Sequence, residues 1–270
     1  MSKTSRTTRA VRTAALTAAL TAGAAVALPA TAHAADAEHY YIEIGGTGAT
    51  TNKDGCATGT SSYDAANSAL PPGSAAIKVC YPATAGPIIG PTGSLLDDKL
   101  QPHLEALTAP TYDASVQLGY QKGLQAAEDT HAAHPDARIT ITGYSQGAQA
   151  ADKVLQTIAS GSTGIPRSQV DGMLYADPMQ PDTGLGAHLP RWLGIPGLAT
   201  APGVGPAEFN GIPVARHCIT ADPVCDLRSL LNAPNYFSLH PLYPKLVIPQ
   251  TLADHGKDGV QWRNADGSAV

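Results

Sequence analysis

Strand-like and helical segments alternate along most of this chain. The strand-like segments cover residues 40–44, 76–81, 138–142, 170–175 and 214–220, and the helical ones cover 112–135, about 146–159 and most of 226–255. Such alternation predicts a mostly parallel sheet with helices on both faces. We therefore expect one α/β domain over residues 35–270, because about 235 residues suffice for a single large core.

The first 34 residues have the organisation of a secretory signal peptide. Four basic residues and no acidic one precede an apolar stretch at 13–28, and Ala32-His33-Ala34 offers a small-residue cleavage site. We expect cleavage near Ala34 or Ala35 and export of the mature chain. A membrane anchor would need about 20 strongly apolar residues, so we expect no stable membrane insertion.

The mature chain is acidic. Removal of the signal leaves 13 Lys and Arg against 22 Asp and Glu, a formal charge of −9. An acidic exported domain is poorly suited to bind nucleic acid or an anionic membrane surface. We expect no nucleic-acid partner, and we expect a monomer.

Four cysteines lie in the mature part, and an even number in an exported chain predicts two disulfides. Cys218 and Cys225 are close enough in sequence to close a small loop, which leaves Cys56 to pair with Cys80. Neither a CxxC nor an HExxH pattern is present. We therefore expect no metal and no cofactor.

One stretch interrupts the alternation. Between residues 181 and 213, 13 of 33 residues are Gly or Pro, yet large apolar residues such as Leu185, Leu193 and Phe209 are scattered through it. A disordered linker would be polar. We expect an irregular apolar excursion packed over one end of the sheet, and the alternative is loop packing without a further role.

The strand-like run 138–142 leads directly into "GYSQG" (143–147), which fits the G-x-S-x-G pattern. In this pattern a sharp turn between a strand and a helix exposes the serine hydroxyl above the sheet. Glycines on both sides leave room for the turn. Ser145 is therefore a candidate nucleophile, and the alternative is a serine that caps the following helix.

A serine needs a base to remove its proton and an acid to orient that base. In α/β folds of this kind the order along the chain is Ser, then Asp or Glu, then His. The acidic candidates are Asp177, directly after a strand, and Asp222, inside "CITADPVC". The histidines after Ser145 are His188, His217, His240 and His255.

Three motifs, "GYSQGA", "CITADPVC" and "LHPLYP", resemble the cutinase-type serine esterases of the α/β-hydrolase class. "IEIGGTGAT", "VCYPATAGPI" and "DPMQPDTG" are similar to the related PE-PPE domain of actinobacterial exported proteins. The resemblance extends from about Tyr40 to Pro244. It implies the three-layer α/β sandwich of that class.

Position by position, the resemblance implies Ser145 as nucleophile, Asp222 as orienting acid and His240 as base. His255 is the main alternative base, and His217 precedes Asp222 on a predicted strand, which favours a structural role. The backbone N–H of Gln146 and the residue Thr47 correspond to the oxyanion hole. The position of Cys56 and the length of the 181–213 excursion depart from the cutinase pattern, and the long excursion favours a covered acyl pocket.

The main hypothesis is therefore a secreted serine esterase or lipase that hydrolyses short- to medium-chain carboxylic esters, including lipid esters, through an acyl-enzyme. The same three residues could pass the acyl group to an alcohol, which would make the protein an acyltransferase. A hypothesis of another class is a catalytically silent cell-envelope binding protein on the same fold. The presence of Ser, Asp and His together argues against that last hypothesis, because a binding protein has no need of all three.

Overall fold

The computed structural model describes residues 37–48, 62–96, 99–190, 193–195 and 199–270. Asp36–Val270 forms one compact unit. The predicted signal peptide, residues 1–34, lies outside the described residues and stays a prediction. Among the described helices, none combines the length and hydropathy needed to cross a membrane.

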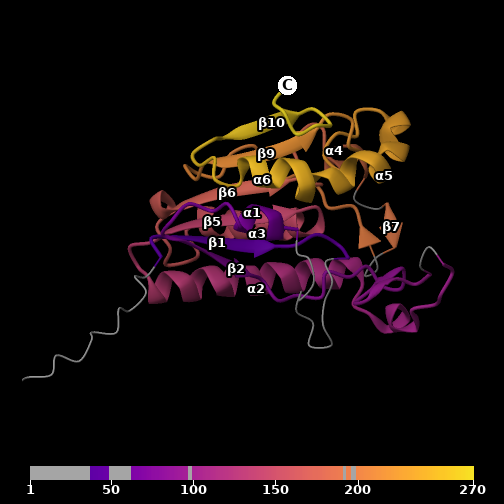
Figure 1. Ribbon diagram of the computed structural model, residues 1–270, viewed down its shortest axis with the longest axis horizontal. Helices are drawn as coiled ribbons and strands as arrows, with labels where there is room; N and C mark the ends of the chain where they lie inside the picture. The colour runs from indigo at the N-terminus through magenta and orange to yellow at the C-terminus, as the bar shows by residue number, and fades with distance from the viewer. Residues whose placement is uncertain (1–36, 49–61, 97–98, 191–192, 196–198) are drawn as a thin grey trace, which may run out of the picture. The chain divides into compact units, whose positions relative to one another are not determined.

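Six strands of the described chain form a sheet in which every neighbouring pair is parallel (Figure 1). In spatial order these strands are β2 (Ser74–Lys78), β1 (His39–Ile44), β5 (Arg138–Tyr144), β6 (Val170–Tyr175), β9 (Val214–Ile219) and β10 (Gly259–Arg263). The predicted mostly parallel sheet is confirmed. Parallel pairing brings the carboxyl ends of all six strands to one edge of the sheet, where residues distant in sequence can meet.

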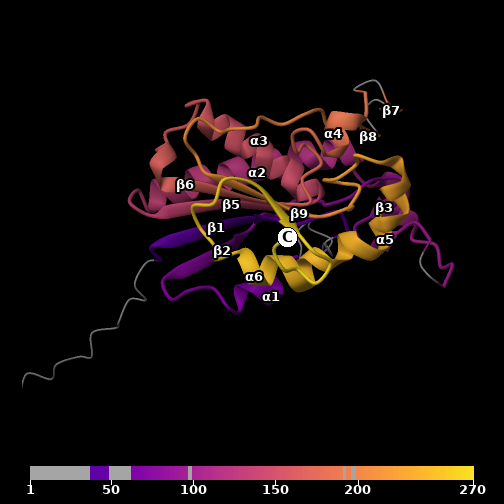
Figure 2. The same cartoon turned by 90° about the horizontal axis from the view of Figure 1, so that it is seen from above.

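Helices cover both faces of this sheet. Figure 2 shows α2 (Tyr112–Ala133) and α3 (Gln146–Ala159) on one side, and α1 (Asp64–Asn67) and α6 (Ile248–Thr251) on the other. The arrangement is the expected three-layer α/β sandwich. The shorter helical segments are η1 (Leu104–Thr108), η2 (Arg167–Gln169), α4 (Leu185–His188), η3 (Leu230–Asn235), α5 (Tyr236–Leu239), η4 (His240–Leu242) and η5 (Tyr243–Val247).

Two small antiparallel pairs lie outside the main sheet. They are β3 (Ile89–Gly90) with β4 (Gly93–Ser94), and β7 (Gly194–Ile195) with β8 (Ala199–Thr200). The second pair and α4 belong to the predicted excursion, residues 181–213. That segment is therefore irregular but folded where the structure describes it.

Alternate residues of the strands serve opposite faces, as the pleat requires. In β1, Ile42 and Ile44 join an aliphatic core beneath α2 and α3, whereas Tyr41 joins a second core on the other face that is rich in tyrosine. Every residue of β6 and β9 is buried. Burial on both faces is typical of central parallel strands, and it also encloses three polar residues of these strands, Asp171, Arg216 and His217.

The sequence-based boundaries differ from the structure in a few places. The predicted strand 76–81 ends at Lys78, and β10 was not predicted. The predicted helical region 226–255 is a series of short segments, because prolines at 234, 241, 244 and 249 interrupt the helical hydrogen bonds.

His217 lies in the middle of the tyrosine-rich face and is fully buried in β9. Its ring stacks on Tyr175 with centroids 5.0 Å apart. Neither ring nitrogen has a hydrogen-bond partner among the described residues. Burial lowers the pKa of His217 to about 3, so the folded protein keeps this imidazole neutral under conditions in which the unfolded chain protonates it.

We predict that His217→Phe makes folding less sensitive to acid. Because the folded-state pKa lies below the unfolded value near 6.5, His217 costs stability progressively as pH falls from about 6.5 toward 3. The difference in unfolding free energy between variant and wild type should widen in favour of the variant by about 1.4 kcal/mol per pH unit below 6.5. Urea unfolding at pH 7, 6 and 5 measures it, and parallel profiles would contradict the prediction.

Candidate active site

Ser145 occupies the single position between the end of β5 and the start of α3. Its backbone has φ +57° and ψ −120°, a conformation that residues other than glycine rarely adopt. The Ser145 N–H donates to the Tyr175 carbonyl at 2.9 Å, and its own carbonyl accepts from Ala148 at the same distance. The strained turn is thus fixed on both sides.

The two glycines of the motif are required by close contacts. A Cβ atom on Gly147 would overlap the carbonyl oxygens of Ile44 and Gly45 at the end of β1. A Cβ atom on Gly143 would overlap the Gly147 carbonyl. The first turn of α3 therefore packs directly against the β1 backbone, which is the physical reason for the G-x-S-x-G pattern here.

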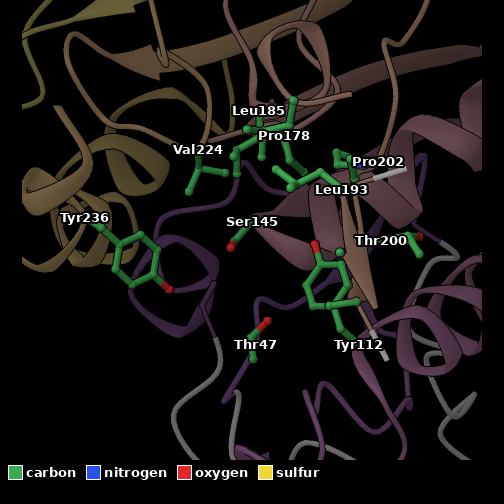
Figure 3. Close-up of a pocket in the computed structure, with 14 residues that line it drawn as sticks. Thr47, Tyr112, Ser145, Pro178, Leu185, Leu193, Thr200, Pro202, Val224 and Tyr236 are labelled. Atoms are coloured by element: carbon green, nitrogen blue, oxygen red, sulfur yellow. The ribbon is translucent and has the colours of Figure 1, made fainter. Parts of the chain in front are cut away.

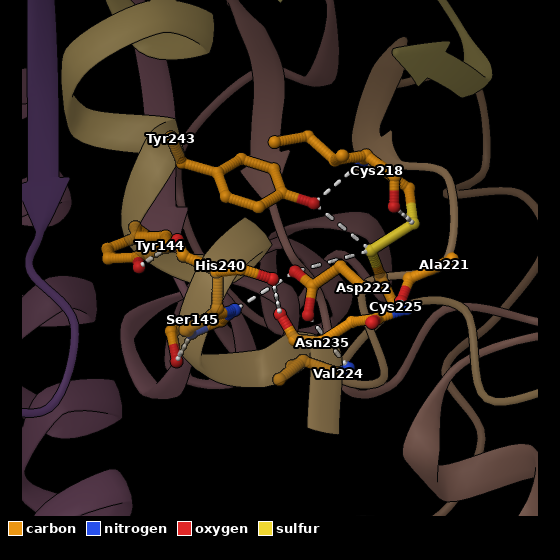
Figure 4. Close-up of polar contacts among 12 residues, drawn as sticks. Tyr144, Ser145, Cys218, Ala221, Asp222, Val224, Cys225, Asn235, His240 and Tyr243 are labelled. Atoms are coloured by element: carbon orange, nitrogen blue, oxygen red, sulfur yellow. Dashed lines mark hydrogen bonds and ion pairs between the residues drawn. A yellow bond between two sulfur atoms is a disulfide. The ribbon is translucent and has the colours of Figure 1, made fainter. Parts of the chain in front are cut away.

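Three side chains predicted from the sequence form one hydrogen-bonded chain (Figure 4). His240 Nε2 lies 2.8 Å from Ser145 Oγ, and His240 Nδ1 lies 2.9 Å from Asp222 Oδ2. Asp222 is fully buried and His240 is 4% exposed. An imidazole in this position can accept the serine proton while the carboxylate holds the other ring nitrogen.

His240 is held by aromatic rings. It is the first residue of η4, and its ring stacks with Tyr144 at 5.1 Å and with Tyr236 at 4.7 Å between centroids. Burial raises the pKa of Tyr144, and its hydroxyl donates to the His240 carbonyl at 2.7 Å. Both the ring and the backbone of His240 are therefore fixed.

Asp222 lies in the loop after β9, and the predicted disulfide between Cys218 and Cys225 closes this loop. Asp222 Oδ1 accepts from the Val224 N–H at 3.2 Å, and its carbonyl accepts from the Asp226 N–H at 2.7 Å. The carboxylate thus has one oxygen for the loop and one for His240. Cys56 lies outside the described residues, so the Cys56–Cys80 bridge stays a prediction.

Asp177, the alternative acid, is engaged elsewhere. Its Oδ2 accepts from Arg216 Nε at 3.0 Å, and Asp152 Oδ2 accepts from Arg216 Nη2 at 2.8 Å. All three side chains are buried, and burial raises the pKa of both carboxyls, that of Asp152 to about 7. Arg216 also donates to the Pro206 carbonyl at 2.9 Å. This ion-pair cluster holds the segments on either side of the excursion.

His255, the alternative base, is also engaged elsewhere. Its Nδ1 lies 3.1 Å from Asp171 Oδ2 and its Nε2 lies 2.7 Å from the Tyr41 hydroxyl. The structure therefore brings His240, and not His255, to Ser145 and Asp222. Sequence spacing alone left both histidines open.

A cavity of about 380 Å³ opens beside Ser145 (Figure 3). Much of its wall comes from the excursion, which contributes α4, β7, β8 and the residues around them. The apolar side chains that line it include Tyr112, Leu185, Leu189, Leu193, Val224 and Tyr236. The described part of the predicted apolar excursion thus covers the site. Two further apolar residues of the excursion, Trp192 and Leu198, lie outside the described residues.

Two contacts that the sequence did not reveal fix the excursion over the cavity. The carboxylate of Asp113, in the first turn of α2, accepts from the Thr200 N–H and from the Thr200 hydroxyl, both at 3.0 Å. Tyr112, the neighbouring residue, lines the cavity and donates to Gln149 at 2.8 Å. An acidic residue such as Asp113 in the first turn of a helix favours the helix N-terminus. The sequence gives no indication that Thr200 is its hydrogen-bond partner.

Thr47 lines the same cavity, in the turn that follows β1. The next residue is fixed by a bond from the Gly48 N–H to the Ala83 carbonyl at 2.8 Å. The Gln146 side chain is fully buried, donating to the Thr84 carbonyl at 2.9 Å and accepting from Ser115 at 3.1 Å. That side chain anchors the start of α3, so any role of Gln146 toward a substrate falls to its backbone N–H.

The chain was compared with known proteins. The Cutinase family model matches residues 40–245, and no curated protein matches the chain. A cutinase-like protein from Cryptococcus sp. has a solved structure that is 19% identical, with 82% of this chain and 93% of that chain covered and a TM-score of 0.47. The catalytic core domain of acetyl xylan esterase from Trichoderma reesei is 20% identical, with 77% and 97% covered and a TM-score of 0.43.

The family match includes the Ser145 turn, the Asp222 loop and His240 as well as five of the six strands of the sheet. The family match does not test the likeness to the PE-PPE domain, which stays a prediction. The chain belongs to the cutinase family and is a carboxylic ester hydrolase with the α/β-hydrolase fold.

Proposed function

We propose that the protein is an exported serine esterase in which Ser145, His240 and Asp222 hydrolyse short- to medium-chain esters through an acyl-enzyme. The observation that carries the proposal is the continuous chain of contacts from Ser145 Oγ through His240 to buried Asp222. Ser145, at one end of these contacts, lines an apolar cavity of about 380 Å³.

In the first step, Ser145 Oγ attacks the carbonyl carbon of the ester while His240 Nε2 takes the hydroxyl proton. Asp222 accepts from Nδ1–H throughout and stabilises the imidazolium that forms. The burial of Asp222 and its bond from the Val224 N–H support this role, because a carboxylate held in place keeps the imidazole in one orientation.

The ester carbonyl oxygen becomes negative as the tetrahedral intermediate forms. We assign its stabilisation to the Gln146 N–H, at the start of α3, and to Thr47, which lines the same cavity as Ser145. The N-terminal end of a helix favours negative charge. Losing one oxyanion donor of this kind typically costs about 3 kcal/mol in the transition state.

The intermediate then collapses. His240 gives its proton to the leaving alkoxide oxygen, the C–O bond to the alcohol breaks, and the acyl group remains on Ser145. Water attacks the acyl-enzyme as His240 takes one of its protons, and the same imidazole returns that proton to Ser145 Oγ as the acid leaves. Each round therefore consumes one ester and one water and releases one acid and one alcohol.

The substrate class follows from the cavity wall. Leucines of the excursion and the rings of Tyr112 and Tyr236 offer contacts suited to an aliphatic acyl chain, and the Ser145 hydroxyl lines the same cavity. A volume of about 380 Å³ suits a short or medium chain. Acyl transfer to an alcohol would use the same groups, and product analysis with added alcohol separates the two reactions.

Ser145→Ala should lower the hydrolysis of p-nitrophenyl esters by at least about 10⁴-fold, because Ser145 Oγ is the hydroxyl in contact with His240 Nε2. The assay uses acyl chains from C2 to C16, and mass spectrometry locates the label left by a serine-directed fluorophosphonate. Ser160→Ala, an exposed serine at the far end of α3, is the control and should keep full activity. No turnover and no label on Ser145 in the wild type would favour a silent binding protein.

Asp222→Asn and Asp177→Asn should have opposite signatures. Asp222→Asn should lower kcat by about 10⁴-fold with little loss of stability, because the neutral amide favours the wrong imidazole tautomer. Asp177→Asn removes a partner of buried Arg216 and should lower the free energy of unfolding by about 3 kcal/mol. Steady-state kinetics and urea unfolding on both variants measure the contrast, and a larger kcat loss in Asp177→Asn would refute the assignment.

Leu189→Trp should shift the enzyme toward shorter esters, because the larger side chain narrows the cavity next to Ser145. We expect kcat/KM for a C8 ester to fall at least about tenfold relative to a C2 ester. Leu107→Trp, at an exposed leucine outside the cavity wall, serves as control. An unchanged chain-length profile would show that the acyl chain does not occupy this cavity.

A further inference from the structure

A second cluster of reactive side chains lies away from Ser145. It consists of His39, the first residue of β1, Asp171, the second residue of β6, and His255, which follows α6. One ligand atom from each residue lies within 4.8 Å of the others. Because the strands are parallel, the cluster sits at the amino-terminal edge of the sheet, whereas Ser145 follows the carboxyl end of β5.

Hydrogen bonds organise the cluster. Asp171 Oδ2 lies 3.1 Å from His255 Nδ1, and Asp171 Oδ1 accepts from the Thr140 hydroxyl. His39 Nε2 lies 2.8 Å from that same hydroxyl. The Tyr41 hydroxyl lies 2.7 Å from His255 Nε2. These contacts hold the two imidazoles and the carboxylate close to one another.

We propose that His39, Asp171 and His255 bind a divalent transition-metal ion of the zinc type. Two imidazoles and one carboxylate are a donor set that suits Zn²⁺, with water completing four-fold coordination. Zinc bonds of about 2.0–2.1 Å place neighbouring ligand atoms of a tetrahedral site about 3.4 Å apart. Asp171 Oδ2 and His255 Nδ1 are 3.1 Å apart, and the three ligand atoms lie within 4.8 Å of one another. Metal binding would therefore require the partly exposed imidazoles to move closer together.

The hydrogen bonds of His255 are compatible with metal binding. A carboxylate oxygen accepts, so His255 Nδ1 carries the hydrogen in its 3.1 Å contact with Asp171. A metal bound at Nδ1 would leave the hydrogen on Nε2, from which it would donate to the Tyr41 hydroxyl. A hydrogen bond from the second imidazole nitrogen commonly orients a histidine ligand.

The surroundings of the cluster give a metal ion access from solvent, but they also place the positive charge of Arg138 next to it. Asp171 is 3% exposed, whereas the His255 side chain is 23% exposed and gives solvent access to the cluster. Arg138 Nη2 lies 3.6 Å from Asp171 Oδ2, and 57% of that side chain is exposed. Arg138 therefore competes with the metal for Asp171 but is free to move toward solvent.

A bound ion would join β1 and β6 to the segment between α6 and β10. That segment leads into the edge strand of the sheet, so the ion would favour the folded state. Tag-free mature protein, treated with chelator and dialysed, is titrated with ZnCl2 by calorimetry. We expect one ion per chain, a rise in Tm of about 5 °C at saturating zinc, and a visible tetrahedral spectrum when Co²⁺ replaces zinc.

Variants locate the ion. His39→Gln, Asp171→Asn and His255→Gln should each lose the zinc-dependent rise in Tm, measured against the same variant without metal so that folding defects cancel. Arg138→Gln should bind zinc several-fold more tightly, because the competing cation is gone. A purely structural hydrogen-bond network would give no such gain.

Two control variants test other histidines. His134→Gln alters a histidine that stacks on Tyr40 at the end of α2, and His240→Gln alters the site beside Ser145. Both should keep the zinc-dependent rise in Tm. Absence of binding by the wild type would overturn the proposal, and so would binding that survives in His255→Gln or disappears in His240→Gln.

Discussion

The close approach of α3 to the end of β1 is the constraint on which the rest of the site depends. At Gly147 the first turn of the helix packs against the carbonyl oxygens of Ile44 and Gly45, with no space for a side chain. This contact forces the chain to reverse direction within one residue, so Ser145 takes a positive φ. The hydroxyl then projects from the sheet edge at the point where loops from β1, β6 and β9 converge.

The Ser145 turn is supported by groups from several distant parts of the chain. Tyr175 in β6 accepts its N–H, and the buried Gln146 side chain connects the next residue to Thr84. His240 in turn is confined by two stacked rings. Preorganisation of this kind places the strain in the folded scaffold, so little rearrangement is needed when a substrate arrives.

Much of the fold and the set of contacting residues could be predicted from the sequence. The strand and helix on either side of Ser145 have strong periodicity, and the cysteines around Asp222 mark a closed loop. β10 escaped prediction because "GVQWR" is an edge strand with mixed polarity, and its place is determined by pairing with β9. The residue pattern alone could not decide whether Asp177 or Asp222 orients the histidine. Asp177 is engaged by Arg216, which lies about 40 residues away in sequence, so this ion pair is visible only in the structure.

Arg216 has a consequence for how the pocket can vary. The Arg216 guanidinium contacts Asp177, just before the excursion, and the Pro206 carbonyl near its end, so the segment between these two residues is tied at both ends to one buried side chain. A segment anchored in this way can change in length and composition while the serine turn stays in place. The segment that covers the cavity can therefore be replaced by one of different sequence. Such a replacement would change ester selectivity without any change to Ser145, His240 or Asp222.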